Sequence, residues 1–356
     1  METHEKPRVS LADYEAYMKR TPTYAPFSVA DILERYIREM NGTATVRGLK
    51  PLLSGHVYGL RMLQRFPIGA KDARKLTKLD IIEHCKMRRA TVKAATVNQD
   101  ITYLRGPLDY AGSAWDDCPD ITSAAMIAAR PALLKWDLIG KGAPRTRIIT
   151  DEERELLLKD FEEQDKNPRH KIKMVLLVLF GLVSTRRRGE VCRITHPDCD
   201  WDRKDKHGKP TPMYWVRDMK HPKRKKGNHK AFPIVPELAE IIVRLPSYHA
   251  YMEKVQRIGK ELADQDGDRL FPYNAVSVGA KYTIAKKKFG IVNLTLHDNR
   301  GTGISHWLKK YPPHKVRLYF SGHNNTHILE TVYDRRDPVD YYSEGQAPQP
   351  TASLPA

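Results

Sequence analysis

Six side chains in this sequence have the types that phosphodiester chemistry requires. An arginine offers two N–H donors in a fork that matches phosphate oxygens, a histidine adds a donor, and a lysine can protonate a leaving oxygen. A tyrosine can attack phosphorus, but a phenol ordinarily keeps its proton up to about pH 10 and needs nearby cations or a base. The candidates are Arg187, Lys220, His297, Arg300, His323 and Tyr333.

Two of these candidates, His297 and Arg300, lie three positions apart in a segment with helical spacing. The segment LTLHDNRGTGISHWLKK covers residues 294–310, and its apolar residues recur on one helical face. Residues at i and i+3 share a face, so both side chains can point at one ligand. Taken alone, the pair is more simply explained as a solvated polar edge on a core helix. A shared ligand becomes the better explanation only if other parts of the chain supply further candidate residues.

Three consecutive arginines at 186–188 follow the apolar run MVLLVLFGLV and precede EVCRI. Such a triplet is normally a solvated patch. Here the apolar flanks hold it near a core, where an arginine must be paired or must bind a ligand. Glu190 lies three residues beyond Arg187 and is placed to support it.

A strongly basic interval between residues 201 and 230 contains eleven Lys or Arg and three Asp. It is either an electrostatic footprint for phosphates or a solvated hairpin. The flanking segments MYWVRDM and KAFPIVP have strand-type composition and predict a hairpin with a long loop. Lys220, at the end of the first strand, is expected to be held in place, whereas lysines at the loop tip would sway.

We expect no metal or cofactor. Asp298 and Glu190 are too scattered to form a carboxylate cluster, which argues against a two-metal nuclease. Cys192, His196 and Cys199 have close spacing but supply only three zinc ligands, with no second Cys/His pair after them. Buried, inert thiols in a reducing cytoplasm are the preferred interpretation of the four cysteines.

The charge composition indicates the chemical class of the partner. The chain has 356 residues, 61 Lys and Arg against 43 Asp and Glu, and a formal charge of +18. This excess indicates a polyanionic partner, most simply nucleic acid, with anionic lipid as the alternative. The longest apolar run is far shorter than the roughly 20 residues of a membrane span, and neither a basic amphipathic helix nor a lipidation motif is evident.

Helical spacing and turn signals predict two domains. The patterns FSVADILERYIREM, TKLDIIEHCKMRR and TVKAATVNQDITYLRGPLDYA are helical, and no strand pattern accompanies them. Thr150 and Glu153 form a capping box that opens the second domain. The predicted division is an N-terminal arm (1–24), an all-helical domain (25–130), an exposed connector (131–147), a second domain (148–340) and a disordered tail (341–356).

In order and spacing, the candidate residues resemble the motifs of the tyrosine recombinase (phage integrase) family. GLVSTRRRGEVCRITHPDCDWD is similar to the first box of that family, which places its first arginine on Arg187 and the acidic partner on Glu190. WVRDMKHPKRKKGNHKAFPIVPEL resembles the β-hairpin with the catalytic lysine, here Lys220.

The resemblance continues towards the C-terminus. LTLHDNRGTGISHWL resembles the second box and gives His297 and Arg300, and SGHNNTHILETVY gives His323 and the nucleophile Tyr333. In the N-terminal half, TVNQDITYLRGPLDYA looks like the last helices of the core-binding domain, so the likeness covers residues 25–340 or so.

The sequence departs from the family in three places. The hairpin loop is longer and more basic, so Lys223 or Lys225 can compete with Lys220. Arginines on both sides of Arg187 allow a shift of register, although Glu190 favours Arg187. The second box has HDNRGTG where the family more often has HDLRRT, which concerns the local packing rather than the chemistry.

The resemblance implies a mostly helical protein with a small β-hairpin, a SAM-like core-binding domain and a catalytic domain. It implies a metal-independent, bacterial cytoplasmic and nucleoid-associated enzyme that recombines DNA sites as a homotetramer through a 3′-phosphotyrosyl intermediate and a Holliday junction. An accessory DNA-bending protein is a further possible partner. The residues expected to contact DNA are Lys223, Arg224, Lys225, Lys226, Arg145 and Arg147.

Two alternatives stay open. A type IB topoisomerase or telomere resolvase uses the same chemistry to relax or reseal DNA, and a test of joining two duplexes separates it from a recombinase. A non-catalytic DNA-binding regulator of the same fold has no need of Tyr333, and a nicked suicide substrate separates that function from an enzyme.

Overall fold

The computed structural model describes residues 16, 19–22, 24–46, 51–219 and 227–334. The chain divides into two compact units, Met1–Ala143 and Pro144–Ala356. Most of the predicted arm and the whole predicted tail (341–356) lie outside the described residues. The same holds for the hairpin-loop residues Lys220, Lys223, Arg224, Lys225 and Lys226.

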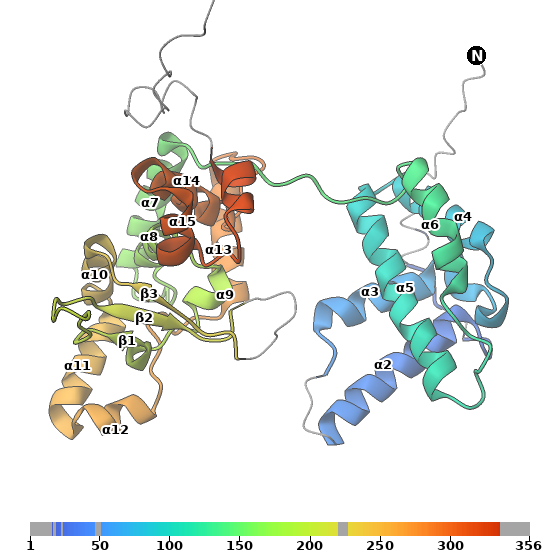
Figure 1. Cartoon of the computed structure of the whole chain (residues 1–356), viewed down its shortest axis with the longest axis horizontal. Helices are drawn as coiled ribbons and strands as arrows, with labels where there is room; N and C mark the ends of the chain where they lie inside the picture. Colours follow the sequence, from blue (N-terminus) through green and yellow to red (C-terminus); the bar gives the residue numbers. More distant parts are fainter. Residues whose placement is uncertain (1–15, 17–18, 23, 47–50, 220–226, 335–356) are drawn as a thin grey trace, which may run out of the picture. The chain divides into compact units, whose positions relative to one another are not determined.

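The elements that the structure describes in the first unit are helices joined by turns and loops (Figure 1). Two of its helices begin at capped residues: Ser28 Oγ accepts a hydrogen bond from Asp31 N at 3.1 Å, and Thr77 forms a capping box with Asp80. The elements are α2 (Val29–Val46), α3 (Ser54–Arg65), η1 (Pro67–Ala70), η2 (Ala73–Lys75), α4 (Lys78–Arg89), α5 (Ala94–Ala114) and α6 (Ala124–Lys135).

Helix α6 extends into the range predicted as a connector. It includes Pro131, the first residue of the predicted connector, and Leu133 beyond it is fully buried in the core of the first unit. Ile139 also belongs to this core. A proline removes one backbone donor, but the apolar burial of α6 outweighs that loss. The extended connector therefore begins later than residue 131.

The second unit combines helices with a three-stranded antiparallel sheet. Strands β2 and β3 form the predicted hairpin, with Met213 opposite Pro233 and Val216 opposite Lys230, and β1 adds an unpredicted edge. The strands are β1 (Cys199–Asp200), β2 (Met213–Val216) and β3 (Lys230–Pro233). The predicted class, mostly helical with a small sheet, is confirmed.

Twelve helical segments of the second unit lie in the described ranges. They include the helix that starts at the Thr150 capping box and the helix predicted within residues 294–310. They are α7 (Asp151–Lys166), α8 (Met174–Ser184), α9 (Arg188–Val191), α10 (Pro236–Val243), α11 (Pro246–Ile258), α12 (Lys260–Gln265), α13 (Ala275–Lys288), α14 (Asp298–Lys310) and α15 (Pro313–Val316), together with the 3-10 segment η3 (His196–Asp198) and the π-helical segments η4 (Arg317–Ser321) and η5 (Leu329–Tyr333).

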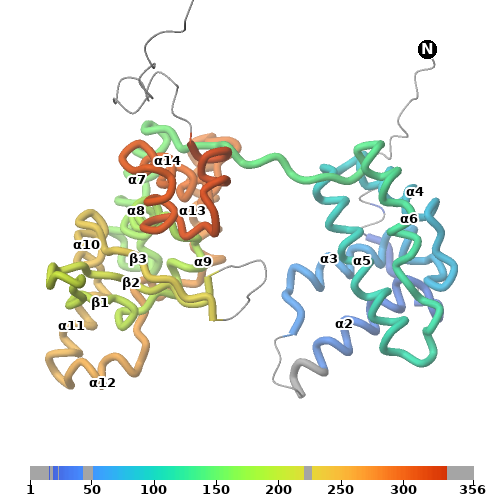
Figure 2. The backbone as a smooth tube through the Cα atoms, in the orientation of Figure 1, coloured from blue at the N-terminus to red at the C-terminus, as the bar shows by residue number. Residues whose placement is uncertain are grey.

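Helix α14 packs closely against α8 (Figure 2). A Cβ on Gly303 would lie 2.0 Å from the carbonyl oxygen of Leu182, so only glycine permits this approach. Trp307 donates its indole N–H to the carbonyl of Val183 at 2.8 Å and stacks on Phe320 at 4.0 Å between ring centroids. These contacts fix the rotation of α14 and hence the direction of the side chains in its first turn.

All four cysteines are buried free thiols. Burial raises the pKa of Cys199 to about 12. His196, the histidine of the three-ligand pattern, stacks on Tyr251 with 4.7 Å between ring centroids. Across the described ranges, no helix has both the length and the apolar character needed to cross a bilayer.

Candidate active site

The three consecutive arginines point in different directions. Thr185 ends α8 in the left-handed region, at φ 53°, which a β-branched residue rarely adopts. After this turn Arg186 is buried, with 2% of its surface exposed, while Arg188 is exposed and lies against α13. Between them, the side chain of Arg187 is 30% exposed. Arg187 is therefore the arginine that is held by the protein yet accessible.

Glu190 holds Arg187 in place. Its Oε1 lies 2.8 Å from Arg187 Nη1, and its Oε2 accepts a hydrogen bond from the backbone N–H of Arg187 at 3.0 Å. The carboxylate is almost fully buried, which opposes ionisation, but Arg186 and Arg187 keep its pKa below the usual range. Both oxygens of Glu190 thus fix the backbone and the side chain of one arginine.

Arg300 lies in the first turn of α14 and is buried. It donates from Nη1 to the carbonyl of Thr185, and from Nη2 to the carbonyl of Ser321 at 2.9 Å. Burial and the charges of Arg186 and Arg187 lower its pKa, although a guanidinium keeps its proton at working pH. Two backbone segments that are distant in sequence therefore meet at this guanidinium.

His323 follows a tight turn that ends η4. Gly322 has φ 66°, and a Cβ there would lie 2.9 Å from side-chain atoms of Met219 and Phe232. His323 Nε2 lies 3.3 Å from Arg300 Nη2. Burial and the neighbouring cations, Arg300 first among them, lower the pKa of His323 to about 3.

Tyr333 ends the second π-helical segment. Its ring centroid lies 5.8 Å from that of His323, and its Cε1 lies 3.5 Å from the position of a Cβ on Gly301. Ser305 Oγ donates to the Tyr333 carbonyl at 2.8 Å and holds the segment to α14. π-Helical turns are rare and concentrate at functional sites. Here η4 ends two residues before His323, and η5 ends at Tyr333, which carries the phenol.

His297 and Tyr333 line one cavity of about 340 Å³. His297 is exposed and immediately precedes α14, so the spacing of three noted in the sequence brings His297 to the cavity while Arg300 turns inward. Five of the predicted catalytic residues are thus described, and Arg187, Arg300, His323 and Tyr333 are connected through short contacts or mutual charge effects.

The predicted DNA contacts Arg145 and Arg147 line the same cavity but have carboxylate partners. Arg145 Nη2 lies 2.7 Å from Asp298 Oδ2, and Arg147 pairs with Glu153. The Arg145 side chain is 38% exposed. Both arginines therefore attach the first residues of the second unit to α14 and α7. Their contact with DNA stays a prediction.

Lys230 was not predicted as a site residue. Its Nζ donates to the carbonyl of Gly322 at 2.8 Å. Burial, Arg317, Arg186 and Arg187 lower its pKa, so it lies within the cationic cluster. A sequence signal existed: Lys230 and Phe232 share a face of β3 because side chains alternate along a strand, and Phe232 is a core residue.

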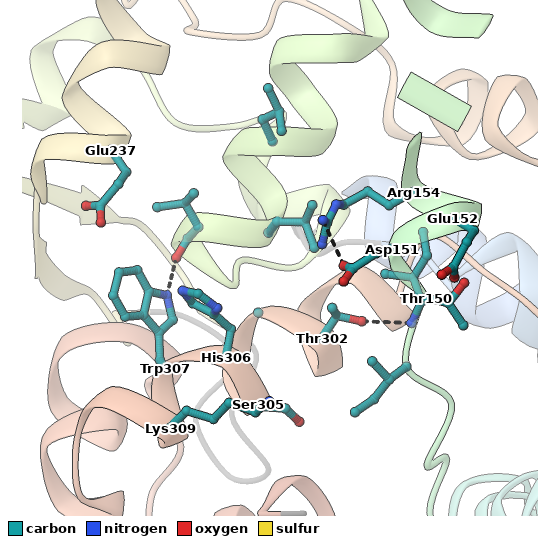
Figure 3. Close-up of a pocket in the computed structure, with 16 residues that line it drawn as sticks. Thr150, Asp151, Glu152, Arg154, Glu237, Thr302, Ser305, His306, Trp307 and Lys309 are labelled. Carbon is teal, nitrogen blue, oxygen red and sulfur yellow. Dashed lines mark hydrogen bonds and ion pairs between the residues drawn. The ribbon is translucent and has the colours of Figure 1, made fainter. Parts of the chain in front are cut away.

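A larger cavity of about 690 Å³ lies on another side of α14 (Figure 3). Figure 3 shows Thr302, His306 and Trp307 of α14 on one side and the start of α7 on the other. The backbone N–H of Ile149 donates to Thr302 Oγ1 at 3.1 Å across it. None of the described catalytic candidates lines this cavity, whereas His297 and Tyr333 line the smaller one.

Comparison with known proteins points to one group. No family model matches the chain. A protein of Haemophilus influenzae named "Putative integrase/recombinase" is 23% identical over 312 residues, which cover 87% of this chain and 88% of that protein.

Solved structures agree with this relative. A Tn1549 transposon integrase in complex with transposon right end DNA superposes with a TM-score of 0.53 at 16% identity, covering 89% of this chain and 98% of that one. A lambda integrase dimer bound to a core site gives a TM-score of 0.55 at 16% identity, covering 87% and 79%. The chain has the fold of these integrases, which are tyrosine recombinases.

Proposed function

We propose that this chain is a site-specific DNA recombinase of the tyrosine type, an integrase that cuts and rejoins DNA through a 3′-phosphotyrosyl intermediate. The observation that carries the proposal is the meeting of the Tyr333 ring, the His323 imidazole and the Arg300 guanidinium within one unit of one chain. These groups come from η5, the turn after η4, and α14. The similarity to an integrase/recombinase and to integrases solved with DNA supports it.

In the proposed reaction, the Tyr333 oxygen bonds to the scissile phosphorus as the bond to the 5′ oxygen breaks. Arg187 and Arg300 donate to the non-bridging oxygens, whose negative charge grows in the transition state. His297 takes the phenolic proton, and Lys220 supplies a proton to the departing 5′ oxygen. The phosphotyrosyl bond conserves the energy of the broken bond, so resealing by a 5′-hydroxyl requires no nucleotide.

The partner is double-stranded DNA, as the formal charge of +18 favours. A lambda integrase tetramer has been solved on a Holliday junction, with a TM-score of 0.54 at 15% identity to this chain. We propose the same homotetrameric assembly here, acting on cytoplasmic DNA in a bacterium and moving a phage or another mobile element.

The decisive experiment uses a suicide substrate that carries a nick beside the cleavage point, so that the covalent complex accumulates. Element-end DNA supplies the site, and mapping of protein-linked 3′ ends identifies it. Wild type is expected to form the adduct, and Tyr333→Phe to bind DNA normally without forming it. Tyr319→Phe, which alters an exposed tyrosine in η4, is the matched control and should react like wild type.

Adducts that persist in the Tyr333→Phe variant would move the nucleophile elsewhere. Relaxation of supercoils without joining of two duplexes would favour the topoisomerase alternative. Tight DNA binding by wild type with no adduct would favour a regulator.

A further inference from the structure

Arg186 is a buried cation that the proposed reaction does not use. Only 2% of its surface is exposed, and it forms no ion pair with any carboxylate in the described part of the chain. Its guanidinium stacks on Phe232, with 3.8 Å from Cζ to the ring centroid, and Nε donates to the Ser184 carbonyl at 2.9 Å. A buried charge without a paired carboxylate is costly, so an apolar residue would suit the core better.

Arg186 contacts both backbone segments that hold the site together. Nη2 donates to Thr185 Oγ1 at 3.3 Å, and that hydroxyl in turn donates to the Phe320 carbonyl at 2.8 Å. The carbonyl of the same Thr185 accepts from Arg300. On the other side, Nη1 lies 3.3 Å from the position of a Cβ on Gly322, next to His323.

Arg186 also adds to a local excess of positive charge. Its charge helps to lower the pKa values of Arg300, His323 and Lys230. Glu190 is the carboxylate that moderates this cluster: it is bonded to Arg187 and is also attracted to Arg186, so its single negative charge is shared among several cations. Such an excess of positive charge favours the binding of an anion next to the cluster.

We propose that Arg186 is a positioning residue of the proposed active site: it supports the Thr185 and Gly322 segments, and it adds positive charge, only partly offset by Glu190, that favours binding of the scissile phosphate. The proposal rests on the proposed function, because it takes the anion to be a DNA phosphate. Arg186 has no contact with the DNA surface in this scheme, so its effect is expected on the cleavage step and not on overall DNA affinity.

The test compares Arg186→Met, which keeps much of the volume, with Arg186→Lys, which keeps the charge. Arg188→Met removes an equal charge from the exposed neighbour and is the matched control. Four quantities are measured on the full chain: the thermal midpoint, the dissociation constant for site DNA, the single-turnover cleavage rate at saturating suicide substrate, and the rise in thermal midpoint caused by inorganic phosphate relative to chloride at equal ionic strength.

For Arg186→Met we expect a thermal midpoint equal to or above that of wild type, unchanged DNA affinity, and cleavage slowed by roughly tenfold or more. The phosphate-dependent rise should shrink in the same variant. Arg186→Lys should recover most of both losses, and Arg188→Met should show neither. A residue that served only the core would lower the thermal midpoint and leave the phosphate response intact.

Three results overturn the proposal: Arg186→Met behaving like Arg188→Met, Arg186→Lys behaving no better than Arg186→Met, or loss of cooperative unfolding in Arg186→Met. If wild type itself forms no adduct, the proposed function fails. The phosphate-dependent rise in thermal midpoint, which needs no DNA, still shows whether the charge of Arg186 contributes to anion binding.

Discussion

Nη2 of Arg300 lies 3.3 Å from Nε2 of His323, in hydrogen-bond contact. A guanidinium can only donate, so Nε2 accepts and the ring proton belongs on Nδ1. Nδ1 is itself buried and has no hydrogen-bond partner within the described ranges. His323 is therefore a neutral imidazole beside a fixed cation, and its Nδ1–H is a donor without a partner among the described residues. This N–H is suited to bind a phosphate oxygen.

His323 should make the protein sensitive to acid. Its pKa in the folded chain is about 3, below the ordinary 6.5, so the unfolded chain takes up a proton first and stability falls as the pH drops from 6.5 towards 3. In His323→Asn, the loss of unfolding free energy between pH 7 and pH 5 should be smaller by roughly 1 kcal/mol, allowing for partial exposure. Urea unfolding at both pH values measures it. Equal losses in variant and wild type would contradict a neutral imidazole.

Local patterns predicted the elements whose signals are contained within a few residues. The Thr150 and Glu153 capping box starts α7, with Glu153 N donating to Thr150 Oγ1 at 3.2 Å. Strand composition on both sides of the basic interval predicted β2 and β3. The spacing of His297 and Arg300 placed both at the start of α14, because the apolar stripe of that helix fixes its buried face.

Features that depend on tertiary contacts were not predictable. The direction of Arg186 follows from the left-handed Thr185, a conformation that the sequence does not favour and that its bonds to Arg300 and Phe320 stabilise. Helix α6 passes through Pro131 because its apolar face is buried. Strand β1 has only two residues, too few for an alternating pattern.

Gly322→Ala should damage both stability and cleavage. The left-handed backbone alone costs a non-glycine residue roughly 1 kcal/mol, and the added Cβ would also press on Met219 and Phe232. Gly290→Ala is the matched control, because Gly290 has φ 64° but nothing within 4 Å of the new Cβ. We expect a larger loss of unfolding free energy in Gly322→Ala, and slow cleavage in that variant only. Similar losses in both variants would mean that the turn is not packed as described.

Glu190→Gln should slow cleavage while leaving DNA affinity nearly unchanged. The amide keeps one acceptor for Arg187 but replaces the other with a donor and removes the buried negative charge. We expect a loss of roughly ten- to a hundredfold in the single-turnover rate, as for other partners that orient a reactive group. Glu163→Gln, in an exposed pair with Lys166, is the control and should have no measurable effect. A Glu190→Gln enzyme as fast as wild type would separate Glu190 from the reaction.

The identity of the general acid can be decided between two lysines of different environment. Lys220 lies outside the described residues, whereas Lys230 is half-buried and donates to the Gly322 carbonyl. If Lys220 gives the proton to the leaving oxygen, Lys220→Ala should slow cleavage by orders of magnitude, and a 5′-thio leaving group, which needs no general acid, should restore it. Lys230→Met should slow cleavage less and show no thio rescue, because its effect comes from the loosened Gly322 turn. Rescue of Lys230→Met with none for Lys220→Ala would assign the proton to Lys230, and rescue of neither would direct the search to Lys223 and Lys225.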